Sequence, residues 1–234
     1  MDFSKPIVKG TLVRRYKRFL ADVELENGEL TTVHCANPGA MAGLADPGLP
    51  VICSTSPNTS RKLPLSLEMV RLETGWVGIN TSLPNKLVAE ALAERKIAAL
   101  AAYESIRPEF PYGTNSRVDF LLSGDGQTNC YVEVKNVHFS RIGGLAEFPD
   151  SPTARGAKHL GELAKVVEAG HRAIMLYVVQ RDDCASLSLA PDFDPAYVTA
   201  FKNASSRGVE TLAFACHLSE QGISLGAPVE FIAP

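Results

Sequence analysis

Arg117-Val-Asp-Phe-Leu-Leu122 and Tyr131-Val-Glu-Val-Lys-Asn-Val137 are the stretches that decide the fold. Both are rich in the β-branched and aromatic residues that suit a pleated surface, and the segment between them contains the turn sequence Gly-Asp-Gly. The pair therefore predicts a β-hairpin. Because side chains alternate between the two faces of a strand, Glu133 and Lys135 share one face. Asp119 can lie across from Glu133 on the neighbouring strand.

These three side chains suit a divalent metal site. Mg²⁺ is usually held by one or two carboxylates and keeps several waters, which leaves positions for phosphate oxygens. A bound metal polarises a phosphodiester, while a nearby lysine balances the negative charge that develops. Asp119 and Glu133 are thus the candidate ligands of Mg²⁺ or Mn²⁺, and Lys135 completes the candidate catalytic group. The alternative is an exposed ion pair between Glu133 and Lys135, which contributes only ~0 to 1 kcal/mol.

Asp119 followed by Glu133-Val-Lys135 resembles the short Asp…(Asp/Glu)-X-Lys signature of the PD-(D/E)XK nuclease superfamily. Longer blocks over most of the chain resemble the sugar fermentation stimulation protein family, in that family's order. These blocks are His34-Cys-Ala-Asn-Pro-Gly-Ala-Met41, Leu83-Pro-Asn-Lys-Leu-Val88, Arg117-Val-Asp-Phe120, Tyr131-Val-Glu-Val-Lys-Asn-Val137 and Phe148-Pro-Asp-Ser-Pro-Thr-Ala-Arg-Gly-Ala-Lys-His159. The resemblance implies a prokaryotic cytoplasmic protein with an OB-like amino-terminal part, a nuclease-like carboxy-terminal part and non-specific DNA binding.

The resemblance implies two further features. In nuclease folds of this kind an acidic residue on the first helix often faces the metal, which makes Glu90 a fourth candidate catalytic residue. The alternative for Glu90 is an exposed ion pair with Lys86, one helical turn earlier. The family name implies a regulator linked to sugar (maltose) metabolism.

The chain of 234 residues is long enough for one large domain or two small ones, and we expect two. Residues 1–82 are expected to form an OB-like barrel that binds nucleic acid, and residues 83–234 a nuclease-like domain. The sequence contains neither a signal-peptide pattern nor an apolar run that could cross a membrane. Its five cysteines are widely spaced and include no Cys-X-X-Cys pair, which argues against a disulfide framework and a zinc site. A cytoplasmic location is expected.

Basic residues are concentrated near the amino terminus, although the net charge is −3. Six of them and no acidic residue lie between Lys5 and Arg18. Basic and aromatic residues interleave in this run, a pattern suited to phosphates and unstacked bases. Arg14, Arg15, Lys17 and Arg18 are therefore candidate phosphate contacts. The alternative is a charged edge strand that resists aggregation.

The amino-terminal part has the pattern of a small β-barrel. Apolar and polar residues alternate over residues 7–36, and Asn27-Gly28 is a typical hairpin turn. Short strands are expected at 51–54, 65–70 and 76–79, separated by glycine and proline. Together they predict an OB-like barrel.

The carboxy-terminal part mixes helices and strands. A long helix is expected from about residue 84 to 102, followed by a strand interrupted at Pro108 and, after the central hairpin, a mobile loop at 138–150. A second helix follows from about 153 to 170, then a buried strand at 173–179, a helix at 195–206 and a strand at 211–216. This order predicts a restriction-endonuclease-like α/β core with a mixed sheet.

The amino terminus of the second helix is a further candidate phosphate site. Backbone N–H groups and the helix dipole favour an anion there, and Arg155, Lys158 and His159 lie within reach. The alternative is that these side chains cover a solvated helix face.

Three functions are compatible with these patterns. The first is a metal-dependent endonuclease or exonuclease that hydrolyses DNA phosphodiesters. The second is a DNA-binding regulatory or architectural protein that keeps the fold and the metal site. The third is a small-molecule or protein-binding module without a nucleic-acid role. The expected partner is DNA, bound largely without sequence preference, and assembly into a homo-oligomer stays open.

Overall fold

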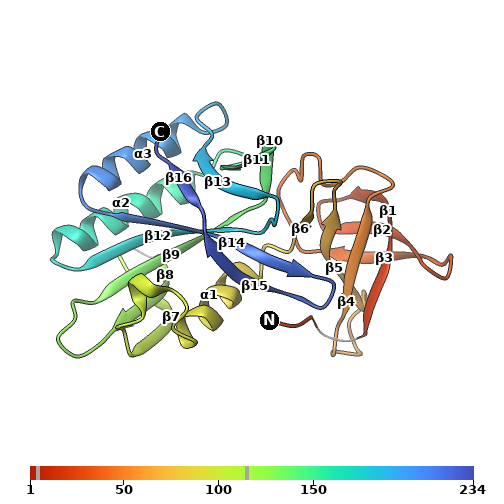
Figure 1. The fold of residues 1–234 in the computed structure, drawn as a ribbon, viewed down its shortest axis with the longest axis horizontal. Coiled ribbons are helices and arrows are strands. Elements are labelled where there is room, and N and C mark those ends of the chain that lie inside the picture. The colour runs from red at the N-terminus through yellow and green to blue at the C-terminus, as the bar shows by residue number, and fades with distance from the viewer. Residues whose placement is uncertain (4–5, 114–115) are drawn as a thin grey trace.

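The computed structural model describes residues 1–3, 6–113 and 116–234. Figure 1 shows an all-β part built from the amino-terminal third of the chain beside an α/β part built from the rest. Lys5, one of the six basic residues of the amino-terminal run, lies outside the described residues. Within the described ranges, no helix is long and apolar enough to cross a membrane.

The amino-terminal part is a closed barrel. Its strands are β1 (Ile7–Tyr16), β2 (Leu20–Leu25), β3 (Leu30–Cys35), β4 (Pro50–Thr55) and β5 (Leu65–Arg71), with β6 (Trp76–Gly78) paired to β5. They follow the order β3-β2-β1-β4-β5, and a parallel pairing of β3 with β5 joins the two ends. Closure pairs strands that would otherwise be sheet edges. The predicted OB-like barrel is confirmed.

Side chains alternate between the inside and the outside of this barrel, and the inward-facing ones fill its core. Leu12, Val23, Val33 and Leu67 are fully buried in its core. Gly28 closes the β2–β3 hairpin with φ at +82°, a conformation that residues with a Cβ rarely adopt. The Asn-Gly turn therefore fixes the register in which this core forms.

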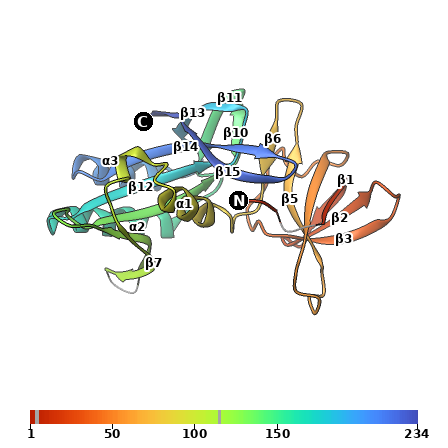
Figure 2. The same cartoon turned by 60° about the horizontal axis from the view of Figure 1, so that its bottom comes forward.

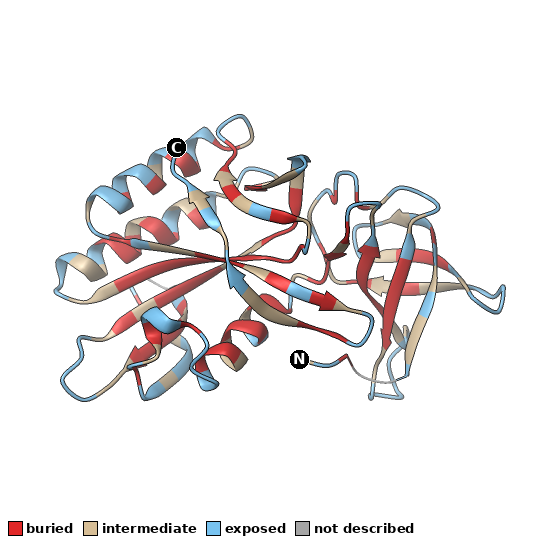
Figure 3. Ribbon diagram, in the orientation of Figure 1, coloured by how far each residue is buried: buried red, intermediate tan, exposed pale blue. Residues whose placement is uncertain are grey.

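The α/β part is built on a mixed sheet with the order β15-β14-β12-β9-β8-β7. Its strands are β7 (Ser105–Tyr112), β8 (Ser116–Ser123), β9 (Cys130–Val137), β12 (Arg172–Val179), β14 (Glu210–Ser219) and β15 (Gly222–Pro228). β8 and β9 form the predicted antiparallel hairpin, whereas β12 pairs in parallel with β9 and β14. Residues 173–179 of β12 are buried, as their continuous apolar run predicts, and Figure 3 shows this burial in the middle of the sheet.

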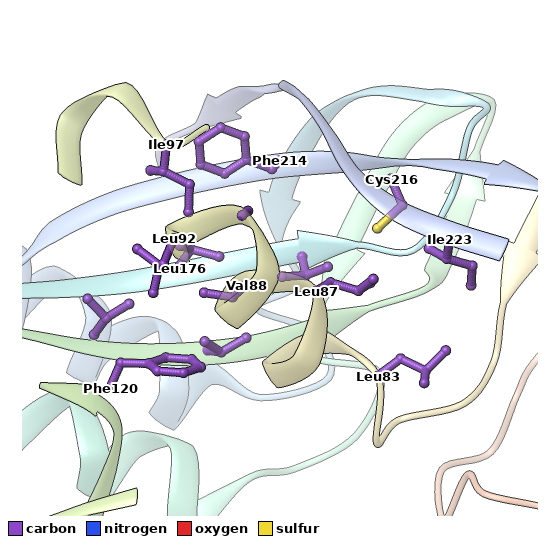
Figure 4. Close-up of a cluster of buried hydrophobic side chains, with 14 of the residues drawn as sticks. Leu83, Leu87, Val88, Leu92, Ile97, Phe120, Leu176, Phe214, Cys216 and Ile223 are labelled. Carbon is purple, nitrogen blue, oxygen red and sulfur yellow. The ribbon is translucent and has the colours of Figure 1, made fainter. Parts of the chain in front are cut away.

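Helices cover both faces of this sheet. α1 (Pro84–Ala93) lies on one face, and α2 (Ala154–Glu168) and α3 (Pro195–Ser206) lie together on the other (Figures 1 and 2). Figure 4 shows the core under α1, where Leu87 and Val88 gather with Phe120 and Leu176 of the sheet. Each face therefore has its own apolar core, and a polar side chain that points into either core needs a specific partner.

The first helix is shorter than predicted. It ends before Arg95, whose φ of 55° is the left-handed conformation common at helix ends. The chain then turns and buries Ile97 and Leu100, and a short 3-10 segment, η1 (Ala98–Leu100), replaces the last predicted turns. Burial of these two apolar side chains thus outweighs the helix propensity of the alanines around them.

Pro108 does not interrupt its strand. β7 pairs with β8 on both sides of the proline, and Pro108 itself lies opposite Phe120. β7 is the edge strand of the sheet, so the missing N–H of the proline leaves no inner strand without a partner.

Most of residues 138–150 form a hairpin, with a shift in register, rather than the predicted mobile loop. β10 (Phe139–Ile142) pairs with β11 (Gly144–Phe148). β11 pairs in parallel with β13 (Cys184–Leu189), and β16 (Glu230–Ile232) completes this small second sheet. Neither β13 nor β16 was predicted. The Arg141 guanidinium binds both the buried Glu147 and the exposed Asp192. This shared arginine ties the hairpin to the chain after β13.

A buried ion pair at the end of β12 receives a hydrogen bond from the barrel. Arg181 is 5% exposed, and its guanidinium donates to both carboxylate oxygens of Asp183 at 2.7 and 2.8 Å. Asp183 also accepts a hydrogen bond from the Thr74 hydroxyl, which lies in the turn before β6. Gln180, the residue before Arg181, accepts a hydrogen bond at its carbonyl from the Gly78 N–H of β6 at 2.8 Å. The barrel is therefore fastened to the residues that follow β12 by a backbone hydrogen bond and by the hydrogen bond of Thr74 with Asp183.

Replacing Asp183 with Asn should reduce the free energy of unfolding by about 3 kcal/mol at pH 7, because the buried Arg181 guanidinium loses its counter-charge. Urea unfolding measures this loss. The matched control is Asp192→Asn, which removes an exposed partner of Arg141 and should cost less than about 1 kcal/mol. Equal stability of the Asp183 variant and the wild type would contradict the role assigned to this pair.

The same pair predicts a pH dependence. Burial acts to raise the pKa of Asp183, but the hydrogen bonds from Arg181 and Thr74 lower it to about 2, from the usual 3.8. A carboxyl with a depressed pKa in the folded state contributes stability above its unfolded pKa and loses it as the pH falls through the folded pKa. The stability gap between wild type and Asp183→Asn should therefore shrink between about pH 4 and pH 2.

Candidate metal and nucleic-acid site

Asp119 lies where β8 and β9 separate. The last registered pair of the two strands is Phe120 with Val132, whereas β8 continues along β7 as far as Ser116. At the separation, Asp119 Oδ2 accepts from the Val134 N–H at 2.7 Å, and Oδ1 accepts from Asn85 Nδ2 of α1 at 2.7 Å. The carboxylate thus takes the place of a strand partner for β9 and is fixed from both sides.

Glu133 lies on β9, opposite Asp119 if the register is continued by one pair. Its side chain points to the sheet face that α2 covers, and the residue is 3% exposed. Oε1 accepts from Lys135 Nζ at 2.7 Å and also forms a hydrogen bond with His159 Nδ1 of α2. The structure therefore brings Glu133 and Lys135 together in a buried pair, not in the exposed pair of the alternative interpretation.

The two carboxylates differ in their electrostatic surroundings. Burial, followed by the negative charge of Glu133, raises the pKa of Asp119 above its usual value. Burial also acts to raise the pKa of Glu133, but the hydrogen bond with His159 and the charge of Lys135 outweigh it and lower that pKa. Glu133 is therefore held as a carboxylate inside the protein, and its charge acts on Asp119.

Several buried oxygens beside this group lack a hydrogen-bond partner among the described residues. They are Glu133 Oε2, Glu162 Oε2 and the Tyr112 hydroxyl. Burial raises the pKa of Tyr112, and the charges of Glu133, Glu162 and Asp119 raise it further, so the four groups lie within one electrostatic neighbourhood. A buried oxygen without a partner costs free energy, which a water or a bound ion can offset.

The donor set fits Mg²⁺ or Mn²⁺ in one binding mode. Asp119 and Glu133 supply two carboxylates, and Glu133 Oε2 is buried without a partner in the described ranges of the chain. Among the residues that the structure describes, no group of three or more His, Cys, Asp or Glu is arranged to hold a metal ion. A cation held by Asp119 and Glu133 would therefore keep several of its waters, as Mg²⁺ usually does.

Glu90 is not brought together with these residues. Its carboxylate forms an ion pair with the Met1 amino group at 2.8 Å, and the same amino group donates to the Ile223 carbonyl of β15. Figure 2 shows the amino terminus beside α1 and β15. Asn85 is the α1 side chain that reaches Asp119, and the ion pair of Glu90 with Lys86 that served as its alternative is replaced by the pair with Met1.

A pocket of about 630 Å³, lined by three basic residues and by Glu109, lies at the amino-terminal end of α2, and its Lys158 is 3.6 Å from the Glu162 carboxylate. Its lining includes Arg155, Lys158 and Arg117, together with His159, whose other ring edge holds Glu133. Thr153 caps the helix by accepting from the Gly156 N–H. The predicted residues Arg155 and Lys158 therefore lie on the surface next to the carboxylate group.

The basic run of the barrel divides by environment. Arg14 forms an ion pair with Asp22 at 2.7 Å, and its guanidinium lies over the Tyr16 ring. Lys17 and Arg18 form the tip of the β1–β2 hairpin, where both are exposed. The tip residues therefore present their charge to solvent, whereas the charge of Arg14 is largely balanced.

Arg15 has a structural role that the sequence does not reveal. Its Nη2 donates to the carbonyls of Asn37 and Gly39, both at 2.8 Å, and to that of Arg18 at 3.0 Å. The guanidinium thus fastens the Asn-Pro-Gly loop to the β1–β2 hairpin. Asn37 Nδ2 adds a hydrogen bond to the Ile79 carbonyl at 2.8 Å, which ties the loop to the segment leading into α1.

This barrel loop forms one wall of a pocket beside Lys135. The pocket has a volume of about 430 Å³ and is lined by residues 37–39 of the barrel, by residues 135–139 and by residues 147–153. Both parts of the molecule therefore contribute to the surroundings of the candidate catalytic lysine.

Sequence reasoning did not show which side chains hold the carboxylates: Asn85 was not singled out, and His159, expected to reach phosphate, is instead buried against Glu133. Asn85 and His159 lie 34 and 26 residues from the side chains they contact. Both occur inside the blocks that carry the family resemblance, which was the available signal. Their spacing alone could not show which carboxylate each one meets.

Comparison with known proteins agrees with this architecture. Residues 13–79 match the family model described as the SfsA N-terminal OB domain, and residues 82–222 match the one described as the sugar fermentation stimulation protein RE domain. The solved structure of Pyrococcus furiosus SfsA in complex with Ca²⁺ superposes with a TM-score of 0.87, at 24% identity and with 99% of each chain covered. That likeness confirms the fold.

Curated relatives match along nearly the whole chain. The sugar fermentation stimulation protein homolog of Ruegeria pomeroyi is 54% identical over 226 residues, which is 96% of this chain and 98% of the relative. The homolog of Paramagnetospirillum magneticum is 50% identical over 229 residues, which is 98% of this chain and 97% of the relative. The chain therefore belongs to the sugar fermentation stimulation protein family.

Proposed function

We propose that this protein binds DNA without sequence preference and holds a divalent cation, Mg²⁺ or Mn²⁺, with the carboxylates of Asp119 and Glu133. The observation that carries the proposal is the buried Glu133, which has one oxygen held by Lys135 and His159 and the other without a partner in the part of the chain that the structure describes. A buried carboxylate beside a second carboxylate and an ammonium group is the arrangement expected where a cation meets a phosphate.

Basic surfaces near this group support a polyanionic partner. The pocket lined by Arg117, Arg155 and Lys158 adjoins His159, and the hairpin tip with Lys17 and Arg18 is joined through Arg15 to the loop beside Lys135. Cations arranged in this way bind the phosphates of a nucleic acid largely independently of its sequence.

Phosphodiester hydrolysis is the second candidate function, and the complete Asp119, Glu133 and Lys135 set favours it. A bound cation would polarise the phosphodiester and lower the pKa of a water that it binds. In this chain, the Lys135 ammonium group beside Glu133 would balance negative charge on the phosphate, and His159 orients Glu133. Asn85 and the Val134 N–H orient Asp119 in the same way.

The wider role follows from the names of the relatives. We propose a cytoplasmic protein with a regulatory link to sugar (maltose) metabolism, because the relatives are named sugar fermentation stimulation protein homologs. Assembly into a homo-oligomer remains an open alternative to a monomer.

The metal proposal predicts the behaviour of substituted proteins in calorimetric titration with Mn²⁺. Asp119→Asn and Glu133→Gln should each weaken binding by about tenfold or more, since one carboxylate offsets too little of the dehydration of the ion. Glu90→Gln is the matched control and should leave the affinity unchanged, because Glu90 is paired with Met1. Unchanged affinity in both the Asp119 and Glu133 variants would refute the ligand assignment.

DNA binding should depend on salt through the hairpin tip. Removing one phosphate contact should reduce the slope of log K against log salt by about 0.9 on duplex DNA. The double variant Lys17→Ala/Arg18→Ala should thus flatten the slope by about twice that amount while keeping the barrel folded. Lys202→Ala on the exposed surface of α3 is the control. If the double variant keeps the wild-type affinity and slope, the DNA-binding surface does not include the β1–β2 hairpin tip.

Incubation with supercoiled, linear and branched DNA plus Mg²⁺ or Mn²⁺ tests hydrolysis. We expect products from the wild type and a rate about 100-fold lower in Lys135→Ala, which loses an ammonium group that acts on the reacting phosphate. DNA binding by this variant, measured without metal, should persist. If no DNA form yields product, hydrolysis is refuted and the DNA-binding proposal still stands. If Lys135→Ala keeps full activity, the role of the lysine is refuted.

A further inference from the structure

The pocket between the barrel loop and residues 147–153 has two kinds of wall. Pro38 of the barrel, Phe139 and Pro149 supply apolar surface, and the polar part of the lining includes Lys135 and Glu147. Its volume of about 430 Å³ falls in the range of pockets that hold small organic groups. The pocket also contains a buried polar atom, Nε2 of His138, that has no hydrogen-bond partner among the described residues.

A chain of amide contacts fixes the tautomer of His138. Gln180 Nε2 lies 3.2 Å from the Asn80 carbonyl, and because a carbonyl only accepts, the Gln180 group that faces it must be the amide nitrogen. The same nitrogen donates to Asn136 Oδ1 at 2.6 Å, which leaves Asn136 Nδ2 facing His138 Nδ1 at 2.8 Å.

His138 Nδ1 therefore accepts a hydrogen bond, and the proton of the neutral ring lies on Nε2. Burial lowers the pKa of His138, which favours this neutral form. The result is a buried N–H donor that lines the pocket and has no acceptor of its own among the residues that the structure describes.

An acceptor lies beside this donor. Asp150 Oδ2 is 3.7 Å from His138 Nε2, which is too long for a hydrogen bond, so both groups can meet a third one. The Gly39 backbone packs against this carboxylate, because a Cβ on Gly39 would lie 2.9 Å from Asp150 Oδ2. A carboxylate at this point disfavours a phosphate in the pocket and favours a neutral group that carries both a donor and an acceptor.

We propose that this pocket receives one unpaired nucleobase of the DNA strand whose phosphodiester lies at Lys135. A nucleobase is flat and largely apolar on its faces and carries adjacent donors and acceptors on its edge, which matches the apolar walls, the His138 N–H and the Asp150 carboxylate. The inference rests on the proposed DNA function and adds the substrate class, namely DNA with an unpaired nucleotide beside the bound phosphate.

Base pairing explains why a fully paired strand should bind less well. A paired base has its edge occupied and its faces stacked, so it must be unstacked before it can enter, and the free-energy cost is least for a base that is already unpaired. The barrel loop encloses one side of the pocket, and the Arg15 contacts hold that loop in place.

The test measures the affinity of the full chain, without divalent metal, for a short duplex and for the same duplex carrying one bulged 2-aminopurine. We expect the bulged DNA to bind about tenfold more tightly and the fluorescence of the unpaired base to change on binding. Ser151→Trp should fill the mouth of the pocket, because Ser151 is exposed and lines it, and should abolish both effects while leaving the affinity for paired duplex unchanged. Asp150→Ala should reduce the preference without adding bulk.

Ser205→Trp, on the exposed surface of α3, is the matched control for the added indole and should behave as the wild type. Equal affinity of the wild type for bulged and paired DNA would overturn the inference and leave the proposed DNA function standing. A preference that survives in Ser151→Trp would also overturn it. If neither DNA binds the wild type, the proposed function fails together with the inference.

Discussion

The burial of the Glu133 carboxylate is the constraint on which the site depends. An ionised carboxylate inside a protein is unstable unless charged or hydrogen-bonding groups compensate its lost hydration. Here Lys135 on the same strand and His159 on α2 supply that compensation at Oε1. Only one oxygen is satisfied in this way, because Oε2 has no partner among the described residues. The fold thus holds a negative charge and leaves part of its binding capacity unused, which an additional cation would satisfy.

The geometry of the hairpin makes this arrangement possible. β8 pairs with β7 from Ser116 onward, but its registered pairs with β9 begin only at Phe120. In the space between β8 and β9 before Phe120, the Asp119 carboxylate accepts from the Val134 N–H. The barrel is held against the same end of the sheet by the hydrogen bond of Thr74 with Asp183 and by that of Gly78 with the Gln180 carbonyl. Asn37 and Gln180 add contacts with the connecting segment. Both parts of the chain therefore surround Lys135, although most of the amino-terminal part lies far from it in sequence.

The periodicity of apolar residues and the residues typical of turns are local properties of the sequence. They sufficed to predict the hairpin of β8 and β9, the closed barrel, the buried β12 and the last two helices. Contacts between distant segments were not predictable in this way. The length of α1 was overestimated because the burial of Ile97 is a tertiary effect, and residues 138–150 were interpreted as a loop because the pairing of Arg141 with Glu147 and Asp192 is invisible in sequence. Asp119, Glu133 and Lys135 were candidates from their pattern, whereas the contacts of Asn85 and His159 with the carboxylates and the structural role of Arg15 required the fold.

The central claim is that the Asp119 and Glu133 carboxylates form a cation site, and crystallography with Mn²⁺ tests it most directly. Crystals of the protein soaked in Mn²⁺ should show an anomalous difference peak within metal-ligand distance, roughly 2 Å, of one oxygen from each carboxylate, with waters completing the coordination. An anomalous map without a peak at these two side chains, in crystals that bind Mn²⁺ elsewhere, would contradict the account.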